Sequence, residues 1–257
     1  MTLSIPHALS VWRRNAAMYR RTWWLNILPN FFEPVLYLLS IGVGVGALAS
    51  DVSVGGKMLP YRAFVAPGML AAAAMNGAIL DTTFNFFFKF KYAKTFDSML
   101  ATPLGTTDIA VGELLWAQLR GTIYAAAFLV TMVAFGLTRG PWVILGAPAA
   151  MLIGFAFGGI GMAATTWIRS FVHFDYINLA LIPLFLFSAT FFPLSLYPTT
   201  LQWIVRATPL YQGVALERGL VLGDVGWVLA GHVAYLATLG TLGVWVTQRR
   251  LSRLLLP

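Results

Sequence analysis

The sequence predicts an all-α polytopic membrane protein, and three observations favour this fold class. Of the 257 residues, 59% are hydrophobic and only 10% are charged, with a mean hydropathy of +0.77, whereas an ordinary soluble domain has about 25% charged residues. Several apolar runs approach or exceed the roughly 20 residues that a helix needs to cross a bilayer. The alternation typical of a membrane barrel is absent. We therefore predict six transmembrane helices, at residues 31–49, 63–88, 109–137, 142–168, 176–193 and 225–247.

The segment ahead of the first predicted span, residues 5–28, has the pattern of an interfacial amphipathic helix. Its apolar residues recur at steps of four and three and form one stripe: Trp12, Ala16, Tyr19, Trp23 and Ile27. Its cations lie on a different face: Arg13, Arg14, Arg20 and Arg21. This pattern suits a helix along the inner leaflet with its cations near anionic lipid headgroups. The alternative is that these cations only anchor the start of the first span.

The distribution of cations sets the orientation of the six predicted spans. An even number of crossings places both termini on one side, and short cytoplasmic segments carry the excess of Lys and Arg. With the termini in the cytoplasm, the inner segments hold eleven of these residues and the outer segments hold five. The net charge of +8 then reflects this bias rather than affinity for nucleic acid.

Charged residues inside the spans are costly and are usually paired or face a polar cavity. Asp81 precedes Lys89 by eight residues, which places it about 12 Å inside the inner boundary at 1.5 Å per residue. Arg120 lies about 18 Å along the third span by the same rise. We predict an interhelical network of Asp81 and Arg120, with Glu113 as a third candidate member, and expect it to hold the fold rather than carry protons.

Two further stretches predict specific packing. GFAFGGIG, at residues 154–161, carries small residues at a spacing that permits close helix contact. Residues 194–222, by contrast, form neither a plain polar loop nor a clear span, because prolines punctuate them. We predict an extracellular re-entrant helical hairpin at 194–222. It is a candidate gate, because irregular backbone at membrane depth must be covered by protein or line a wet cavity.

Motifs for catalysis and metal binding are missing from the sequence. There are no cysteines, and the three histidines are scattered. VGGKM, at residues 54–58, lacks the first glycine and the Ser or Thr of a phosphate-binding loop. We therefore predict no catalytic residue, no metal, no bound cofactor and no enzymatic activity in this chain.

Several motifs, taken in order, resemble those of a known family. FDSMLATPL lies at residues 96–104, VGELLW at 111–116, HFDYINL at 173–179 and LFLFSATFFPL at 184–194. Together with the interfacial segment and the spans, they resemble the membrane subunit of type-2 ATP-binding-cassette (ABC-2) exporters. The resemblance covers essentially the whole chain and is nearest to nodulation-type lipo-oligosaccharide and antibiotic-efflux permeases.

The resemblance implies a role for the polar segment 92–104 between the second and third spans. In such permeases this segment forms a short cytoplasmic coupling helix that docks in a cleft of a separate ATP-binding subunit, which binds ATP and Mg. The docking face would carry Phe96, Met99 and Leu100, at helical spacing. The remaining coupling residues are Asp97, Thr102 and Pro103. The alternative is a turn at the lipid surface with incidental apolar residues.

The family pattern also implies partners, location and substrate. Two permeases, this chain with a second copy or a related chain, would join two ATP-binding subunits in a bacterial inner membrane. Aromatic residues are candidates for the translocation path or gate: Phe84, Phe87, Phe187, Phe191 and Phe192. The expected substrate is an amphiphile, namely a lipid-linked saccharide, a glycolipid or a hydrophobic drug. An ion-coupled secondary transporter without an ATPase is the alternative, although it would favour inverted repeats that the sequence does not show.

Overall fold

The computed structural model describes residues 4–20, 35–40, 44, 51–54 and 57–255, and the predicted first span, 31–49, therefore lies largely outside the described residues. The helices are α1 (Ile5–Tyr19), α3 (Tyr61–Leu80), α4 (Thr95–Leu100), α5 (Thr106–Ala134), α6 (Gly146–Thr165), α7 (Phe174–Leu186), α8 (Thr199–Ala207), α9 (Pro209–Leu222) and α10 (Val228–Leu255). Strands β1 (Val52–Val54) and β2 (Lys57–Leu59) form a short antiparallel pair.

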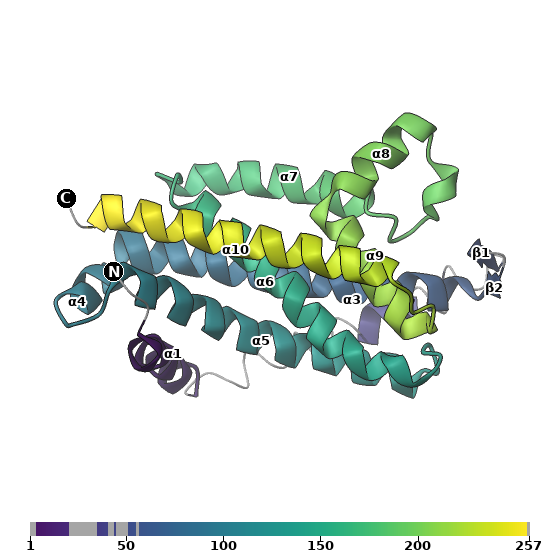
Figure 1. Cartoon of the computed structure of the whole chain (residues 1–257), viewed down its shortest axis with the longest axis horizontal. Helices are drawn as coiled ribbons and strands as arrows, with labels where there is room; N and C mark the ends of the chain where they lie inside the picture. The colour runs from purple at the N-terminus through teal and green to yellow at the C-terminus, as the bar shows by residue number, and fades with distance from the viewer. Residues whose placement is uncertain (1–3, 21–34, 41–43, 45–50, 55–56, 256–257) are drawn as a thin grey trace.

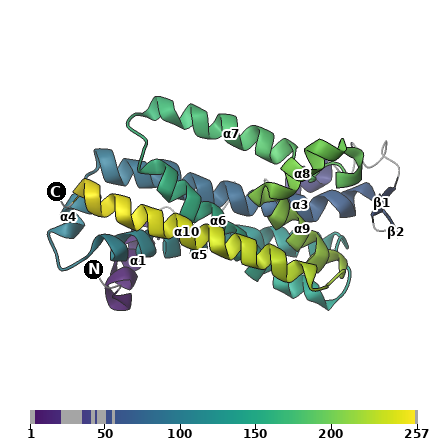
Figure 2. The same cartoon turned by 45° about the horizontal axis from the view of Figure 1, so that its top comes forward.

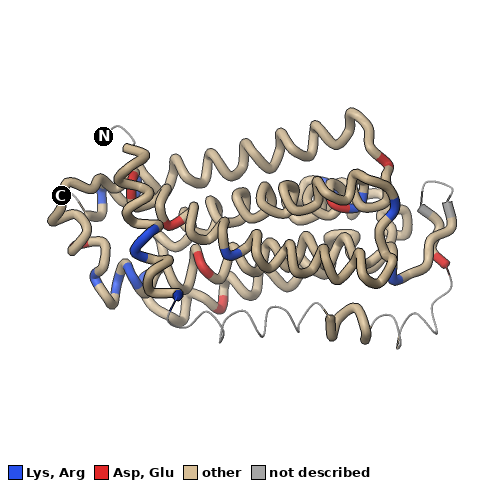
Figure 3. Tube along the Cα trace, turned by 90° about the horizontal axis from the view of Figure 1, so that it is seen from below, with Lys and Arg blue, Asp and Glu red and all other residues tan. Residues whose placement is uncertain are grey.

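The helices form an elongated bundle whose two ends differ (Figures 1 and 2). Helices α3, α5, α6 and α10 run along its length, while α1, α4 and both chain ends gather at one end. The β1–β2 pair, α8 and α9 lie at the other end. Lys and Arg cluster at the end that carries the termini (Figure 3). The two ends of the bundle therefore differ in charge, as the predicted orientation requires.

Within the described residues, four helical stretches are long and apolar enough to cross a membrane: Tyr61–Tyr92, Thr106–Ala134, Pro141–Thr165 and Val228–Leu255. They correspond to the predicted second, third, fourth and last spans. The last helix continues eight residues beyond the predicted boundary, to Leu255. The all-α membrane fold class predicted from the sequence is thus confirmed.

The first of these stretches changes its winding before it ends. Two π-helical segments, Asp81–Asn85 and Phe88–Tyr92, follow α3. The hydroxyls of Thr82 and Thr83 each donate to the carbonyl four residues earlier, at 2.6 Å. Wide π turns in a helix often mark functional sites. Asp81, which is buried, and Lys89, which is half-buried, lie in these two π-helical segments.

Helices α6 and α10 approach through glycines. A Cβ atom built on Gly159 would lie 2.6 Å from the carbonyl oxygen of Gly240, and one built on Gly243 would collide with the backbone of Gly159. Only residues without a side chain allow the two backbones to come this close. The small residues of 154–161 therefore serve the close helix contact that the sequence predicted.

The predicted fifth span, 176–193, is wrong in its second half. A 3-10 turn at Phe171–His173 leads into α7, which ends at Leu186. Ala189, three residues later, adopts a left-handed conformation with φ of 57°, which keeps the helix from resuming. The guanidinium of Arg218, in α9, donates to the carbonyl of Ala189 at 2.9 Å. This hydrogen bond, from a side chain 29 residues away in the sequence, stabilises the turn at Ala189. The apolar run around Ala189 gave no sign of a turn.

Helices α8 and α9 occupy most of the segment predicted as a re-entrant hairpin. Pro198 and Pro209 lie at their starts, and Gly223 ends α9 with a positive φ of 81°. Thr208 caps α9 through a hydrogen bond from the backbone N–H of Tyr211. Two short helices separated by a cap are therefore present, while their depth in a membrane is part of the proposal below.

Candidate functional site

Helix α4 lies at the end of the bundle that carries both termini, between the π-helical stretch and α5. Lys94 precedes it in a left-handed conformation, with φ of 46°. Phe96 is fully buried and packs on Phe86, with ring centroids 4.9 Å apart, and Met99 is only 7% exposed. The prediction that these two side chains face a partner is therefore wrong, because they belong to the hydrophobic core of this chain.

The opposite face of this segment is open. Its exposed residues are Asp97, Ser98, Ala101, Thr102 and Pro103, with Leu100 half-buried beside them. The Thr102 hydroxyl donates to the carbonyl of Met99 at 2.6 Å. The buried face thus fixes α4 to the permease, and the small polar and charged face is the surface that α4 offers outward. Periodicity alone does not distinguish a face that fills its own core from one that fills a partner's groove.

Helix α1 packs across α5 on the residues of the VGELLW motif. A Cβ atom on Gly112 would lie 2.6 Å from Cβ of Val11 and 2.7 Å from the carbonyl oxygen of Ala8. The Trp116 ring meets those of Trp12 and Tyr19 edge-on, with centroids 6.5 and 5.3 Å away. The buried face of α1 is therefore centred on Ala8 and Val11, and the predicted stripe is only partly right.

The cations predicted on α1 lie away from this contact. Arg13, Arg14 and Arg20 are exposed, and Arg21 and Trp23 lie outside the described residues. At the start of α1, the backbone N–H of Ser4 donates to Asp108 at 2.9 Å, and the same carboxylate accepts the N–H of Gly105 at 3.0 Å. One carboxylate therefore caps α5 and joins it to α1.

Two buried ion pairs lie between these elements. The Arg120 guanidinium contacts the Asp81 carboxylate at 2.6 Å, as predicted from the cost of isolated charges in the spans, and their side chains are only 13% and 5% exposed. Arg120 also donates to the Tyr124 hydroxyl, at 2.9 Å, and Asn85 donates to Asp81 at 2.6 Å. Every polar atom named here has a partner, which is what makes a buried pair tolerable.

Glu113 belongs to a second, neighbouring pair. The Lys89 ammonium contacts its carboxylate at 2.6 Å. Asn15, buried in α1, donates to Glu113 at 3.0 Å and accepts from Lys89 at 3.1 Å. This triad joins α1, the π-helical stretch and α5. Its lysine, Lys89, lies six residues before the start of α4. Sequence reasoning missed Asn15 and assigned Lys89 only to the inner boundary.

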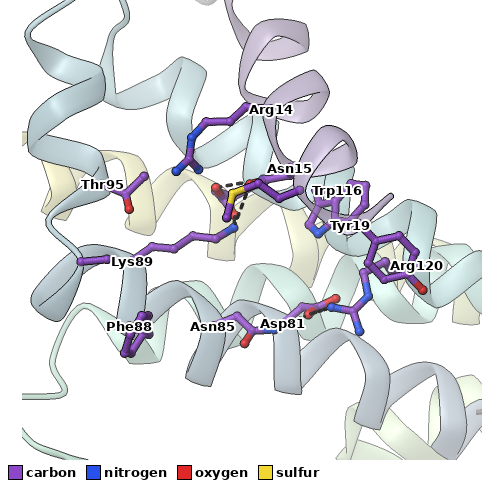
Figure 4. Close-up of a pocket in the computed structure, with 13 residues that line it drawn as sticks. Arg14, Asn15, Tyr19, Asp81, Asn85, Phe88, Lys89, Thr95, Trp116 and Arg120 are labelled. Carbon is purple, nitrogen blue, oxygen red and sulfur yellow. Dashed lines mark hydrogen bonds and ion pairs between the residues drawn. The ribbon is translucent and has the colours of Figure 1, made fainter. Parts of the chain in front are cut away.

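Both pairs line one cavity of about 520 Å³ between α1, the π-helical stretch and α5 (Figure 4). Arg14, Thr95 and Phe88 also line it. Tyr19 lies on its wall, and burial raises the pKa of Tyr19 to about 12. Its phenol is therefore neutral near pH 7, and the charges of the cavity come from the acidic and basic side chains alone.

The predicted path residues do not form one group. Phe87 is fully buried and packs edge-on against Phe171 and Phe174, at 5.4 and 5.3 Å, so within this chain it is a core residue rather than a channel lining. Phe84 is 45% exposed and contacts the same two rings.

The other three predicted path residues follow the far end of α7. Phe187 and Phe192 are exposed, whereas Phe191 packs on Phe185 with ring centroids 5.1 Å apart. They are therefore separated from Phe84 and Phe87 by the length of α7 (Figure 1).

One buried acidic residue was missed altogether. Glu217, in α9, is fully buried, and neither of its carboxylate oxygens has a hydrogen-bond partner among the described residues. A Cβ atom on Gly146 would lie 3.2 Å from one of these oxygens. The available signal was an acidic residue within the apolar run VALERGLVL, which sequence reasoning treated only as part of the hairpin.

Comparisons with known proteins agree with this architecture. The family described as ABC-2 type transporter matches residues 7–221. The chain is 32% identical to Nodulation protein J of Sinorhizobium fredii, over 95% of this chain and 93% of that protein. It is 30% identical to Nodulation protein J of Rhizobium leguminosarum bv. trifolii, over 96% of this chain and 94% of that protein. The chain therefore belongs to the ABC-2 type transporter family and is a multi-pass membrane permease.

Proposed function

We propose that this chain is the permease subunit of an ATP-driven exporter, coupled through α4 to a separate ATP-binding subunit that binds ATP and Mg. The observation that carries the proposal is the two-faced α4. Phe96 and Met99 anchor it in the permease core, while Asp97, Ser98 and Ala101 face outward. A helix held this rigidly transmits a push on its outer face into the bundle.

The Asn15–Lys89–Glu113 triad supports a route for that push. It ties the π-helical stretch that leads into α4 to both α1 and α5. Movement of α4 would therefore displace the interfacial helix and the second and third spans together.

The proposed arrangement has six spans, both termini in the cytoplasm and a bacterial inner membrane as its location. Helix α1 and strand β1 lie at opposite ends of the bundle (Figure 1), which supports a crossing by the chain between them. Five further crossings, by the α3 stretch, α5, α6, α7 and α10, return the chain to the end that carries α1. Helices α8 and α9 would then form the extracellular re-entrant hairpin.

A second copy of the chain, or a related permease, would cover the outer face of α7. Tyr176, Leu179 and Ile182 are at least 60% exposed on this face. Asn178 and Asp175 are exposed as well, and polar side chains facing lipid are costly. A partner permease or a polar substrate route at α7 removes this cost.

The proposed substrate is an amphiphile, namely a lipid-linked saccharide, a glycolipid or a hydrophobic drug. The similarity to proteins named Nodulation protein J, and the resemblance to lipo-oligosaccharide and antibiotic-efflux permeases, support this class. Phe84, Phe187 and Phe192 are exposed, and exposed aromatic side chains agree with an apolar moiety in the path.

Co-purification tests the coupling. Tagged protein extracted in gentle detergent from its native membrane is expected to bring an ATP-binding subunit, identified by mass spectrometry. An Ala101→Arg variant places a large cation on the exposed face of α4. We expect it to recover at least about tenfold less of that subunit, which corresponds to a loss of roughly 1.4 kcal/mol of binding free energy.

The matched control is Ala17→Arg, the same substitution at an exposed position of α1. Equal recovery from wild type and both variants would contradict docking on α4. Absence of any ATP-binding subunit, together with uptake into energised vesicles without ATP, would instead favour the ion-coupled transporter.

A further inference from the structure

We propose that the cavity between α1, the π-helical stretch and α5 binds the headgroup of one monoanionic phospholipid from the inner leaflet. This site goes beyond the proposed export function. It depends on the placement of α1 along the inner leaflet, but not on an ATP-binding partner or on the exported substrate. The cavity of about 520 Å³ falls within the range of roughly 300–1,000 Å³ typical of small-molecule sites.

The charges of the lining fit one negative charge. Three cations line the cavity, Arg14, Lys89 and Arg120, against two carboxylates, Asp81 and Glu113. Each carboxylate is paired with one cation at 2.6 Å, so the positive charge of Arg14 is left without a counter-charge in the lining. Arg14 has no hydrogen bond or ion pair with any other residue that the structure describes. A cation at the surface of the inner leaflet attracts anionic lipid, and a phosphodiester monoanion balances its charge.

The geometry places that charge where a headgroup can reach it. Figure 4 shows the Arg14 guanidinium directed from α1 into the same space as the Lys89 ammonium, with Thr95 beside them. A guanidinium can hold two phosphate oxygens at once, and an ammonium acts as a point charge. Asn15 and Lys89 already occupy the Glu113 carboxylate, which reduces its repulsion of the phosphate.

The rim of the cavity also suits the rest of a lipid. Met18 and Phe88 line the cavity and are 60% and 49% exposed. They offer apolar surface for the glycerol and the first part of the acyl chains, which a free anion does not need. A lipid in this position would bridge α1 and the π-helical stretch that leads into α4, so the bound lipid would brace the interfacial helix against the coupling segment.

The test compares neighbouring cations on α1. Arg14 lines the cavity and Arg13 does not, although both are exposed. The purified full-length permease, with Arg14→Gln or Arg13→Gln, would be titrated with phosphatidylglycerol or phosphatidylcholine, with bound lipid counted by native mass spectrometry. We expect one tightly bound phosphatidylglycerol in wild type and in Arg13→Gln. In Arg14→Gln, binding should be about tenfold weaker, as for the loss of a charge-assisted hydrogen bond.

Three results would overturn the proposal. Equal loss in both variants would indicate general attraction to a basic surface. Equal binding of phosphatidylcholine would remove the argument from net charge. Saturation of the site by glycerol 1-phosphate at the same concentration as the lipid would show a free-anion site instead. Unchanged lipid binding with failed co-purification of an ATP-binding subunit would contradict only the proposed function.

Discussion

An Arg120→Met variant is expected to lose about 3–5 kcal/mol of folding stability, the usual cost of removing one partner from a buried ion pair. Asp81 would keep its hydrogen bond from Asn85, at 2.6 Å, but its charge would have no cation at the 2.6 Å distance of Arg120. The measurement is thermal unfolding of the purified protein in detergent, together with the yield of monodisperse protein from membranes.

The double variant Asp81→Asn with Arg120→Met separates charge from packing. It removes both charges and leaves Asn85 a neutral partner, so most of the lost stability should return. Recovery should stay incomplete, because Arg120 also donates to Tyr124 and lies over the ring of Tyr19. Unfolding of the double variant at or below the temperature of the single variant would contradict the pairing. Wild-type stability of Arg120→Met would contradict it as well.

A Gly159→Val variant is expected to be destabilised by roughly 1–3 kcal/mol or to fail to accumulate, because overpacking forces backbones apart. Its Cβ atom would lie 2.6 Å from a carbonyl oxygen of α10, at Gly240. Unlike the end of a flexible side chain, this backbone atom cannot move alone. The measurement is the fraction of a fluorescent fusion that elutes as a single peak after extraction.

Gly231→Val provides the control, since a Cβ atom there would meet nothing within 4 Å. It carries the same change in helix propensity, in α10 itself. Similar behaviour of the two variants would show that the glycine contact between α6 and α10 does not determine the packing.

The sequence predicted the features that depend on properties of a single segment, such as the free-energy cost of a charge in the bilayer. Asp81 and Arg120 had to find partners because charges are costly in a bilayer, and the structure brings them together. The glycines of 154–161 predicted a close contact between helices, because small residues at this spacing let two helix backbones approach each other. The long apolar runs predicted the stretches at Tyr61–Tyr92 and Val228–Leu255, since length and hydropathy are properties of the segment itself.

The features that were missed depend on contacts distant in the sequence. The turn at Ala189 lies inside an apolar run and is stabilised by Arg218. The partner of Glu113 was missed because Lys89 was counted as a boundary cation, and Asn15 is an isolated amide in a basic helix. Phe96 and Met99 were assigned to the wrong surface, since helical spacing gives a face but not its neighbour.

Cross-linking from neighbouring positions of α4 tests most directly whether the exposed face of α4 docks on an ATP-binding subunit. The chain has no cysteine, so each variant carries a single thiol. Ser98 is exposed and Met99 is buried. In native membranes, Ser98→Cys is expected to cross-link to an ATP-binding subunit through a short thiol–amine reagent, whereas Met99→Cys should stay unmodified. Cross-linking from Met99→Cys alone, or none from Ser98→Cys in membranes that contain the subunit, would contradict coupling through the exposed face of α4.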